Sequence, residues 1–269
     1  MEPLKNKLVR AGEPGHETAG HDTAAAPSGE SIMERVSAQL IARILDTIYD
    51  PGYRLPSERD LAQELAASRV AVREAFRRLQ EWRMISIRRG SGATVLPRNQ
   101  WSSMALWAVL KHALENGDTS LVVTLVSDAL AIRRSLLLEM IGRAAPNLKG
   151  QSLGVERLVV NQVWARRADP KGFVELDQSL IPRVLERADM LASVWILNSL
   201  ADVYSQVMRD FIGAFKVPRS YRAQMMTMLD CLERGESDAA RAALETYLDR
   251  LDRAVISILP ESIADALLE

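Results

Sequence analysis

The stretch from Arg54 to Arg78 constrains the fold more than any other part of the chain, and it reads RLPSERDLAQELAASRVAVREAFRR. Ser57 is a good helix N-cap, and Asp60 follows it at the capping-box spacing, so a short helix begins here. The pair Ala66-Ala67 provides a turn, and Ser68 can cap a second helix. The pattern therefore predicts two short amphipathic helices separated by a tight turn.

The second of these helices has one basic and one apolar face. Arg69 and Arg73 stand four residues apart, so their side chains project from the same side of the helix. The opposite face is expected in the core and carries apolar residues at helical spacing: Val72, Ala75, Phe76 and Leu79. In the first helix, Leu61 and Leu65 are expected in the same core.

A helix precedes this pair and a β-hairpin follows it. Apolar residues recur at helical spacing from Ile32 to Ile48, which predicts one buried face, and turn residues end that helix at 50–52. Residues 84–87 and 93–95 predict two short strands joined by a glycine-containing turn at 88–92. This order of elements predicts a winged helix-turn-helix.

The charge of this region is strongly uneven. The whole chain has a formal net charge of −1, yet residues 68–98 contain eight arginines and two glutamates, a net charge of 8 − 2 = +6. A local basic block favours a phosphate-bearing partner, and an arginine near the start of a helix can bond guanine in the major groove. The alternative is a small helical domain whose basic surface binds protein.

The remainder of the chain predicts helices without strands. Breaks at 117–118, 145–146, 169–170, 217–218 and 235–236 separate six or seven antiparallel helices, and Pro182 should kink or break the one from Phe173 to Arg187. Leu244, Leu248, Leu251 and Val255 form one apolar stripe. The expected fold is mainly α: a disordered extension at 1–31, a winged helix-turn-helix at 32–98, a helical effector-binding and dimerisation domain at 99–260, and a tail at 261–269.

Several classes of protein fit poorly. No apolar run approaches the length of a membrane span, no secretion signal precedes the folded part, and Cys231 is the only cysteine, so a cytoplasmic protein is expected. His112 is the only histidine after residue 31, and it has no evident nucleophile partner. We therefore expect no enzyme, although an enzyme built on the helical bundle remains an alternative.

The motifs LPSERDLAQEL, SRVAVREAFRRL and RRGSGATV resemble the DNA-binding head of GntR-type bacterial transcription regulators over residues 32–97. The helical remainder, including DALAIRRSLLLEMIGRAA, resembles the FadR branch with its FCD ligand-binding domain. The resemblance implies DNA contacts from these residues: Arg59, Ser68, Arg69, Arg73, Arg89 and Gly90. Two positions depart from the family pattern, because Ala66-Ala67 replaces the usual Gly-Val and Arg83 replaces the usual glycine before the first wing strand. If the turn needs a positive φ, Ala66 costs about 1 kcal/mol relative to glycine.

Many FCD domains bind a divalent metal ion through one aspartate and three histidines. By resemblance, the matching positions here are Asp177, Ile181, Met225 and Tyr247. All three imidazoles are missing, so we expect no metal and no other cofactor.

The effector is less defined by the sequence. In the acyl-CoA-sensing branch the last helix offers small, hydroxyl and tryptophan residues, whereas the matching residues here are Leu248, Leu251 and Val255. Candidate polar groups of an effector pocket are Arg133, Arg134, Asp177, Asn198, Tyr204 and Tyr247; each could instead lie on the surface or in a dimer interface. The expected function is a homodimeric regulator that binds double-stranded DNA at a palindromic operator and responds to a small organic acid. Repression is expected because most members of the family are repressors. The alternatives are a DNA-binding dimer without an effector and an acyl-CoA-responsive regulator.

Overall fold

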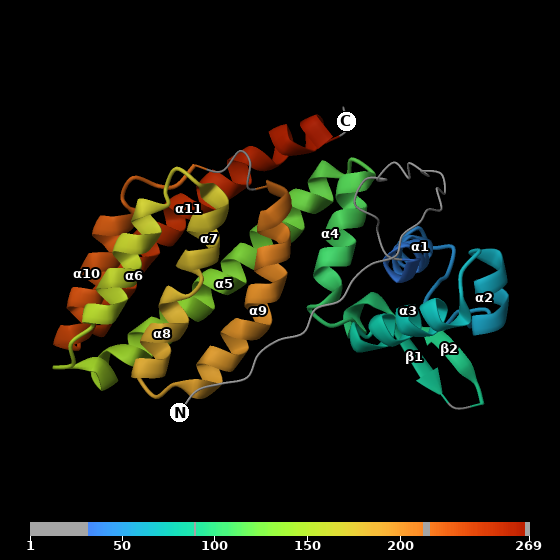
Figure 1. The fold of residues 1–269 in the computed structure, drawn as a ribbon, viewed down its shortest axis with the longest axis horizontal. Coiled ribbons are helices and arrows are strands. Elements are labelled where there is room, and N and C mark those ends of the chain that lie inside the picture. Colours follow the sequence, from blue (N-terminus) through green and yellow to red (C-terminus); the bar gives the residue numbers. More distant parts are fainter. Residues whose placement is uncertain (1–31, 89, 212–215, 267–269) are drawn as a thin grey trace, which may run out of the picture. The chain divides into compact units, whose positions relative to one another are not determined.

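A computed structural model describes residues 32–88, 90–211 and 216–266, without the side chains of 202–211, 258 and 260–266. The expected extension at 1–31 and the expected DNA contact Arg89 lie outside the described residues. Within them the chain is mainly helical, with one two-stranded sheet. This confirms the predicted fold class, an N-terminal winged helix-turn-helix followed by an all-helical part (Figure 1).

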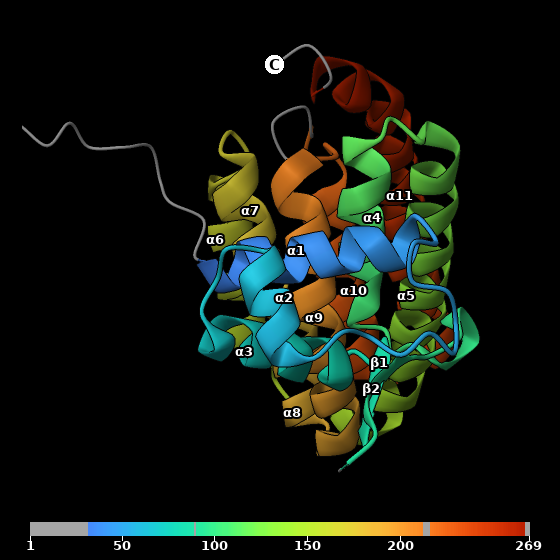
Figure 2. The same ribbon diagram turned by 90° about the vertical axis from the view of Figure 1, so that its right-hand side faces the viewer.

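The N-terminal head contains α1 (Ile32–Leu45), α2 (Glu58–Glu64), α3 (Arg69–Glu81), β1 (Ile85–Arg88) and β2 (Gly92–Val95). The two strands pair antiparallel, with Ile85 opposite Val95 and Arg88 opposite Gly92. Helix α3 packs on both α1 and α2, and the hairpin extends from its C-terminal end (Figure 2). The order of elements is the one that the sequence predicted.

The two predicted caps hold the helices of the head. Ser57 Oγ accepts a hydrogen bond from the backbone N–H of Asp60 at 3.3 Å, and Ser68 Oγ accepts one from Ala71 at 3.1 Å. Each bond satisfies a backbone donor that the first turn of a helix otherwise leaves without a partner. The N-terminus of α3 is therefore fixed one residue before Arg69.

The core of the head is aliphatic, but α1 is shorter than predicted. Helix α1 ends at Leu45, and Thr47 takes a left-handed φ of 58°. Ile32 and Ile48 were expected on the buried face and are 57% and 61% exposed, which corrects that expectation. Ile48 follows the end of the helix, so it no longer shares the helical period. The buried residues include Val36, Leu40, Leu61, Leu65, Val72, Ala75, Phe76 and Leu79.

Both ends of α3 are flanked by non-glycine residues with positive φ. Ala66, in the turn before the helix, has a φ of 46°, and Arg83, in the turn after it, has a φ of 57°. These are the two positions where the sequence replaces the glycines of the related family. A β-carbon in the left-handed region is crowded by the backbone, which costs about 1 kcal/mol relative to glycine. The two turns therefore carry local backbone strain.

The all-helical part contains eight helices among the described residues, against six or seven predicted. The stretch from Phe173 to Arg187 forms two helices, and the break falls at residues 178–179, just before Pro182. A short 3₁₀ helix, η1 (Arg98–Gln100), precedes the first of the eight. The eight helices are α4 (Ala105–Glu115), α5 (Thr119–Leu148), α6 (Gly154–Ala165), α7 (Pro170–Asp177), α8 (Leu180–Arg187), α9 (Leu191–Phe211), α10 (Tyr221–Arg234) and α11 (Ser237–Ala266).

Two helices are longer than predicted. Helix α5 continues through Pro146 to Leu148, because a proline in the last turn removes only one helical hydrogen bond and Leu148 is fully buried. Helix α11 continues past Pro260 to Ala266, into the segment expected to be a tail. The helix breaks at 117–118, 169–170 and 235–236 are where the sequence placed them.

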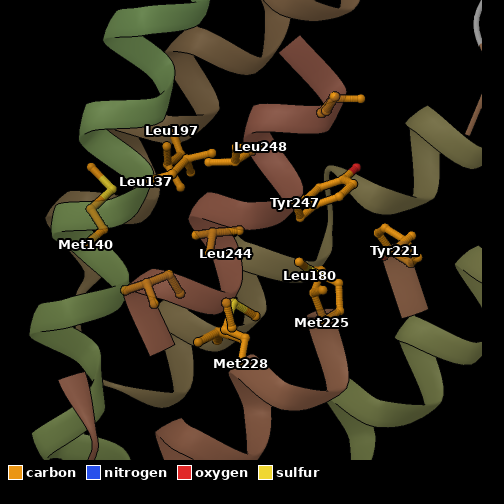
Figure 3. Close-up of a cluster of buried hydrophobic side chains, with 14 of the residues drawn as sticks. Leu137, Met140, Leu180, Leu197, Tyr221, Met225, Met228, Leu244, Tyr247 and Leu248 are labelled. Carbon is orange, nitrogen blue, oxygen red and sulfur yellow. The ribbon is translucent and has the colours of Figure 1, made fainter. Parts of the chain in front are cut away.

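Helices α5 and α11 pack along each other at the centre of the helical part. The Arg241 guanidinium of α11 occupies the space beside Gly142 of α5 that a β-carbon would take. The predicted apolar stripe of α11 is buried, and Cys231 of α10 is a buried core residue. Figure 3 shows part of this core, with Leu137, Leu197 and Leu248 lying close together.

Helix α4 contributes to both hydrophobic cores. Ala105 and Ala108 are buried with the residues of the head, whereas Leu110 and Ala113 are buried with the helical part. On the same helix, His112 Nε2 lies 2.8 Å from Asp46 Oδ1, just after the end of α1. A displacement of α4 would therefore act on both cores.

Candidate DNA-binding surface and effector cavity

Helix α3 presents an exposed face at its N-terminal end. Arg69 is exposed, Val70 is 69% exposed, and the Arg73 side chain is 67% exposed. Among the described residues Arg69 has no ion pair, whereas Arg73 donates from Nε and Nη2 to Glu58 Oε2 of α2, both at 3.2 Å. This face combines two cations with an apolar side chain, which suits the edges of bases in a major groove.

Val70 is a residue that the sequence analysis did not single out. It lies outside the apolar period of α3, which is the signal that could have identified it as exposed. A methyl-bearing side chain between two arginines can contact a thymine methyl group.

The remaining predicted DNA contacts among the described residues are also on the surface. Arg59 of α2 is 73% exposed at its side chain and lies 3.3 Å from Asp60. Ser68 is exposed, although its hydroxyl already caps α3. Gly90 lies in the turn of the hairpin with a φ of 82°, a conformation that glycine adopts without strain.

The hairpin carries a further cation that the sequence analysis did not assign. Arg54 forms an isolated bridge with Thr94, and its guanidinium crosses Gly92, where Nε would lie 3.4 Å from an added β-carbon. Gly92 has a φ of 78° and leaves room for this side chain. Arg54 therefore adds positive charge beside Arg88, which is exposed at the end of β1.

A cavity of about 300 Å³ lies within the helical part. Its wall is formed by α4, α5, α8, α9, α10 and α11 and by the end of α7, and most of the residues that line it are aliphatic, including Leu110, Val126, Leu130, Leu137, Leu180, Leu197, Leu244 and Leu248. The charged side chains of the wall are Arg133 and Asp177. An apolar cavity with a few convergent polar groups is the usual form of a small-molecule site.

Asp177 ends α7 and faces this cavity. Tyr247 of α11 donates a hydrogen bond from its phenol to Asp177 Oδ2 at 3.1 Å. Enclosure by protein atoms raises the pKa of Asp177, whereas the phenols of Tyr221 and Tyr247 and the charge of Arg133 lower it; the enclosure has the larger effect. Asp177 is half-buried and is among the residues that line the cavity.

Tyr221 of α10 lies in the same cluster. Its ring packs edge-on against the rings of Phe173 and Tyr247, and the residue is fully buried. Its hydroxyl forms no hydrogen bond of standard geometry among the described residues. Burial raises the pKa of Tyr221, and the nearby Asp177 carboxyl raises it further. Figure 3 shows Tyr221 and Met225 of α10 near Tyr247 of α11.

Arg133 of α5 is held by α11. Its Nη2 donates to Asp252 Oδ1 at 3.0 Å, and Asp252 also lies 3.3 Å from Arg134. Arg134 donates to Asp249 at 2.6 Å, and Asp249 additionally pairs with Arg253. This cluster contains three guanidinium groups and two carboxylates, so it has a net charge of 3 − 2 = +1.

The structure places the six expected effector residues differently. Arg133, Asp177 and Tyr247 line the cavity. Arg134 belongs to the adjacent ion-pair cluster, and Asn198 is exposed on α9; neither is among the lining residues. The Tyr204 side chain lies outside the described residues. Ser103 and Gln178 also line the cavity, and the sequence analysis did not identify them. The one signal that could have found Gln178 is its place directly after Asp177 in the sequence.

The four positions that match the metal ligands of many FCD domains line this one cavity: Asp177, Ile181, Met225 and Tyr247. The donors they supply are a single carboxylate, a thioether and a phenol that is hydrogen-bonded to the carboxylate. No group of three or more His, Cys, Asp or Glu side chains among the described residues could hold a metal ion. The residues present do not fit a divalent metal, which needs several carboxylate, imidazole or thiolate ligands.

Comparison with known proteins agrees with both parts of the fold. Residues 32–95 match the model of bacterial regulatory proteins of the gntR family, and residues 128–250 match the FCD domain. An HTH-type transcriptional regulator of Mycobacterium tuberculosis, Rv0494, is 39% identical over 227 residues, which cover 83% of this chain and 89% of the relative. The galactonate operon transcriptional repressor of Escherichia coli is 28% identical over 80% of this chain and 93% of its own length.

Among solved structures, one whose title states that Lar controls the expression of the Listeria monocytogenes agr system has the same fold. It shares 14% identity at a TM-score of 0.54, over 86% of this chain and 99% of that chain. The chain belongs to the GntR family of bacterial transcriptional regulators and carries a C-terminal FCD domain, as the sequence motifs predicted. Every helix of the described residues is too short or too polar to cross a bilayer.

Proposed function

We propose that this regulator binds a palindromic operator as a homodimer and represses transcription until a small-molecule effector occupies the cavity of the helical part. The observation that carries the DNA-binding assignment is the face of α3, where Arg69, Val70 and Arg73 are all exposed directly after the Ser68 cap. A helix with this face can enter the major groove with its N-terminal residues against the bases.

A dimer accounts for operator symmetry. Two copies related by a twofold axis would place two α3 helices in successive major grooves, so the affinity for DNA depends on their spacing. The E. coli relative is named a repressor, which supports repression as the sign of regulation. Arg54, Arg59 and Arg88, with Arg89 of the sequence, supply phosphate contacts around the recognition helix.

Helix α4 supports a route from the cavity to the head. Leu106 and Leu110 line the cavity, and Ala105 and Ala108 of the same helix are buried in the core of the head. An effector that binds better to one position of α4 than to another shifts the population of head positions and hence the affinity for the operator.

A titration with DNA that the full-length protein selects from a random pool tests this function. Arg69→Ala and Arg73→Ala should each weaken specific binding by about 1–3 kcal/mol if the residue contacts a base, and binding should fall steeply with added salt. Arg219→Ala, which removes an exposed arginine of the helical part, is the matched control and should bind as the wild type does. Wild-type affinity in both α3 variants would refute the assignment of α3 as the recognition helix.

A second reading is a DNA-binding dimer in which the helical part senses no ligand. The observation that favours an effector is the cavity, whose wall converges on Asp177 and Tyr247. A stabilising ligand in a thermal-shift screen of organic acids and acyl-CoAs separates the two readings. We further propose that the chain has no catalytic activity, since the imidazole of the only histidine after residue 31 contacts the side chains of Asp46 and Asn116.

A further inference from the structure

The cavity differs from a metal-centred acid site in the chemistry of its wall. At the four positions that converge on it, the aliphatic Ile181 and the thioether of Met225 occupy places where imidazoles would be needed. An incoming acid therefore cannot be held by a metal ion, and it must be bound by the side chains themselves.

The charged groups of the wall lie near each other, and most of the rest of the wall, apart from Ser103 and Gln178, is aliphatic. Arg133 reaches the cavity from α5, and Asp177, with its Tyr247 hydrogen bond, reaches it from the end of α7. Such a wall suits a ligand with one polar head and a long apolar body. A ligand with polar groups along its whole length would leave most of them without partners, which is costly in an apolar environment.

The charges beside the cavity favour a ligand whose polar head group is an anion. Arg133 belongs to the cluster of three guanidinium groups and two carboxylates, which has a net charge of +1 without Asp177 and of 0 when an ionised Asp177 near Arg133 is counted. A guanidinium has five N–H donors in a planar fork, so Arg133 can hold Asp252 and a second carboxylate together. Asp177 opposes an anion only in its ionised form, and its enclosure disfavours that form.

We propose that the cavity binds an aliphatic monocarboxylate without a metal ion, with its carboxylate held by Arg133 and the carboxyl group of Asp177 and its chain against the aliphatic wall. Tyr247 donates to Oδ2 of Asp177, which leaves Oδ1 as the oxygen that the proton of a neutral Asp177 would occupy. This inference rests on the proposed function, because it names the effector class of the same site.

Matched probes on the full-length wild-type protein test the head group. Calorimetric titrations with decanoate, decanol and decylamine vary the head at constant chain length, and octanoate and dodecanoate vary the chain. Decanoate should bind at least tenfold more tightly than decanol or decylamine. Within the acid series the affinity should rise about threefold to fourfold for each added methylene until the cavity is full.

Two variants test the contact between Arg133 and the polar head group of the ligand. Arg133→Gln should weaken decanoate binding at least tenfold and leave decanol binding unchanged. Arg134→Gln is the matched control, because Arg134 is the neighbouring residue, shares Asp252 and does not line the cavity; it should change decanoate binding less than about threefold. If Arg133→Gln fails to fold, the head-group series on the wild type decides alone.

Several results would overturn the proposal. Decanol should not bind as tightly as decanoate, and a polar dicarboxylate such as succinate should not bind more tightly than decanoate. Decanoyl-CoA binding more than tenfold more tightly than decanoate would also contradict the proposal. So would loss of decanoate binding in EDTA that ZnCl₂ restores. Operator binding is measured on the same preparation. Operator binding without decanoate binding refutes the ligand class and leaves the proposed function intact, whereas loss of operator binding refutes the proposed function.

Discussion

Arg73 of α3 is bound by Glu58 of α2, with both Arg73 Nε and Nη2 lying 3.2 Å from the same carboxylate oxygen. The pair is exposed, so it contributes little to stability. It does hold one of the two arginines on the exposed N-terminal face of α3 toward α2 in the absence of DNA. A carboxylate beside a DNA-binding surface repels phosphate.

Glu58→Gln should therefore raise the affinity for DNA. The substitution removes the repulsion and loosens Arg73, and we expect a roughly twofold to fivefold lower Kd at low salt, with a smaller effect at high salt. The measurement is a fluorescence-anisotropy titration with selected DNA. Glu115→Gln, which removes one exposed carboxylate from α4 and its pair with Lys111, controls for net charge and should leave the Kd unchanged. Weaker binding by Glu58→Gln would show that Glu58 orients Arg73 productively.

Ala66→Gly and Arg83→Gly should each stabilise the head. Both residues have positive φ, and glycine relieves about 1 kcal/mol of backbone strain, reduced by its greater freedom in the unfolded chain. A net gain of about 0.5 kcal/mol is expected in urea unfolding. Ala62→Gly, in the middle of α2, is the control and should instead destabilise by about 0.5–1 kcal/mol. A loss of stability in both test variants would contradict the claim that Ala66 and Arg83 carry backbone strain.

Asp177→Asn should change how stability depends on pH. Because enclosure raises the pKa of Asp177 in the folded protein, the folded state binds its proton more tightly than the unfolded state does. The wild type therefore loses stability as the pH rises above the unfolded value of about 3.8, until the folded pKa is passed. Asparagine does not titrate, so the melting temperature of the variant relative to the wild type should rise across that window.

The groups that face Asp177 define what else could titrate there. They are Tyr247 of α11, Tyr221 of α10 and Arg133 of α5. The ordinary pKa values of tyrosine and arginine are about 10 and above, so these groups keep their charge state between about pH 4 and 8. Tyr247→Phe removes the 3.1 Å hydrogen bond without removing the carboxyl, and it should leave the direction of the pH dependence unchanged. A pH-independent difference between Asp177→Asn and the wild type would contradict the raised pKa.

His112→Ala should weaken the link between α4 and the head. The substitution removes the 2.8 Å contact with Asp46, so we expect ligand binding to persist while the effect of bound decanoate on operator affinity falls by at least half. The measurement is an operator titration with and without saturating decanoate. Lys111→Ala, an exposed neighbour on α4, is the control. An unchanged ligand effect in His112→Ala would exclude this contact from the coupling.

Much of the head could be predicted because its signals are local. A serine before the first turn of a helix can accept a hydrogen bond from a backbone N–H three residues later, and both Ser57 and Ser68 do so. The same locality explains the error at Ile48, since the helical period was continued past Leu45 without a signal for the turn at Thr47. The positive φ of Ala66 was expected only on the condition that the turn kept the geometry of the family.

The cavity could be predicted only in part. Asp177 and Tyr247 are 70 residues apart in the chain, and their hydrogen bond depends on a tertiary contact that no local pattern encodes. Arg133 and Arg134 are adjacent and chemically identical, yet helical geometry turns only Arg133 toward the cavity. Asn198 was selected for its polarity, and the exposed face of α9 accounts for it.

The position of α4 also determines where this protein can be divided. A fragment that stopped at Arg98 would lose the Trp101 indole, which donates to the Leu96 carbonyl oxygen at 2.9 Å, and the buried methyl groups of Ala105 and Ala108. The complementary fragment would expose those residues to water. Expression of the DNA-binding part alone should therefore retain the chain through Glu115, so that the whole of α4 remains attached to the core it helps to fill.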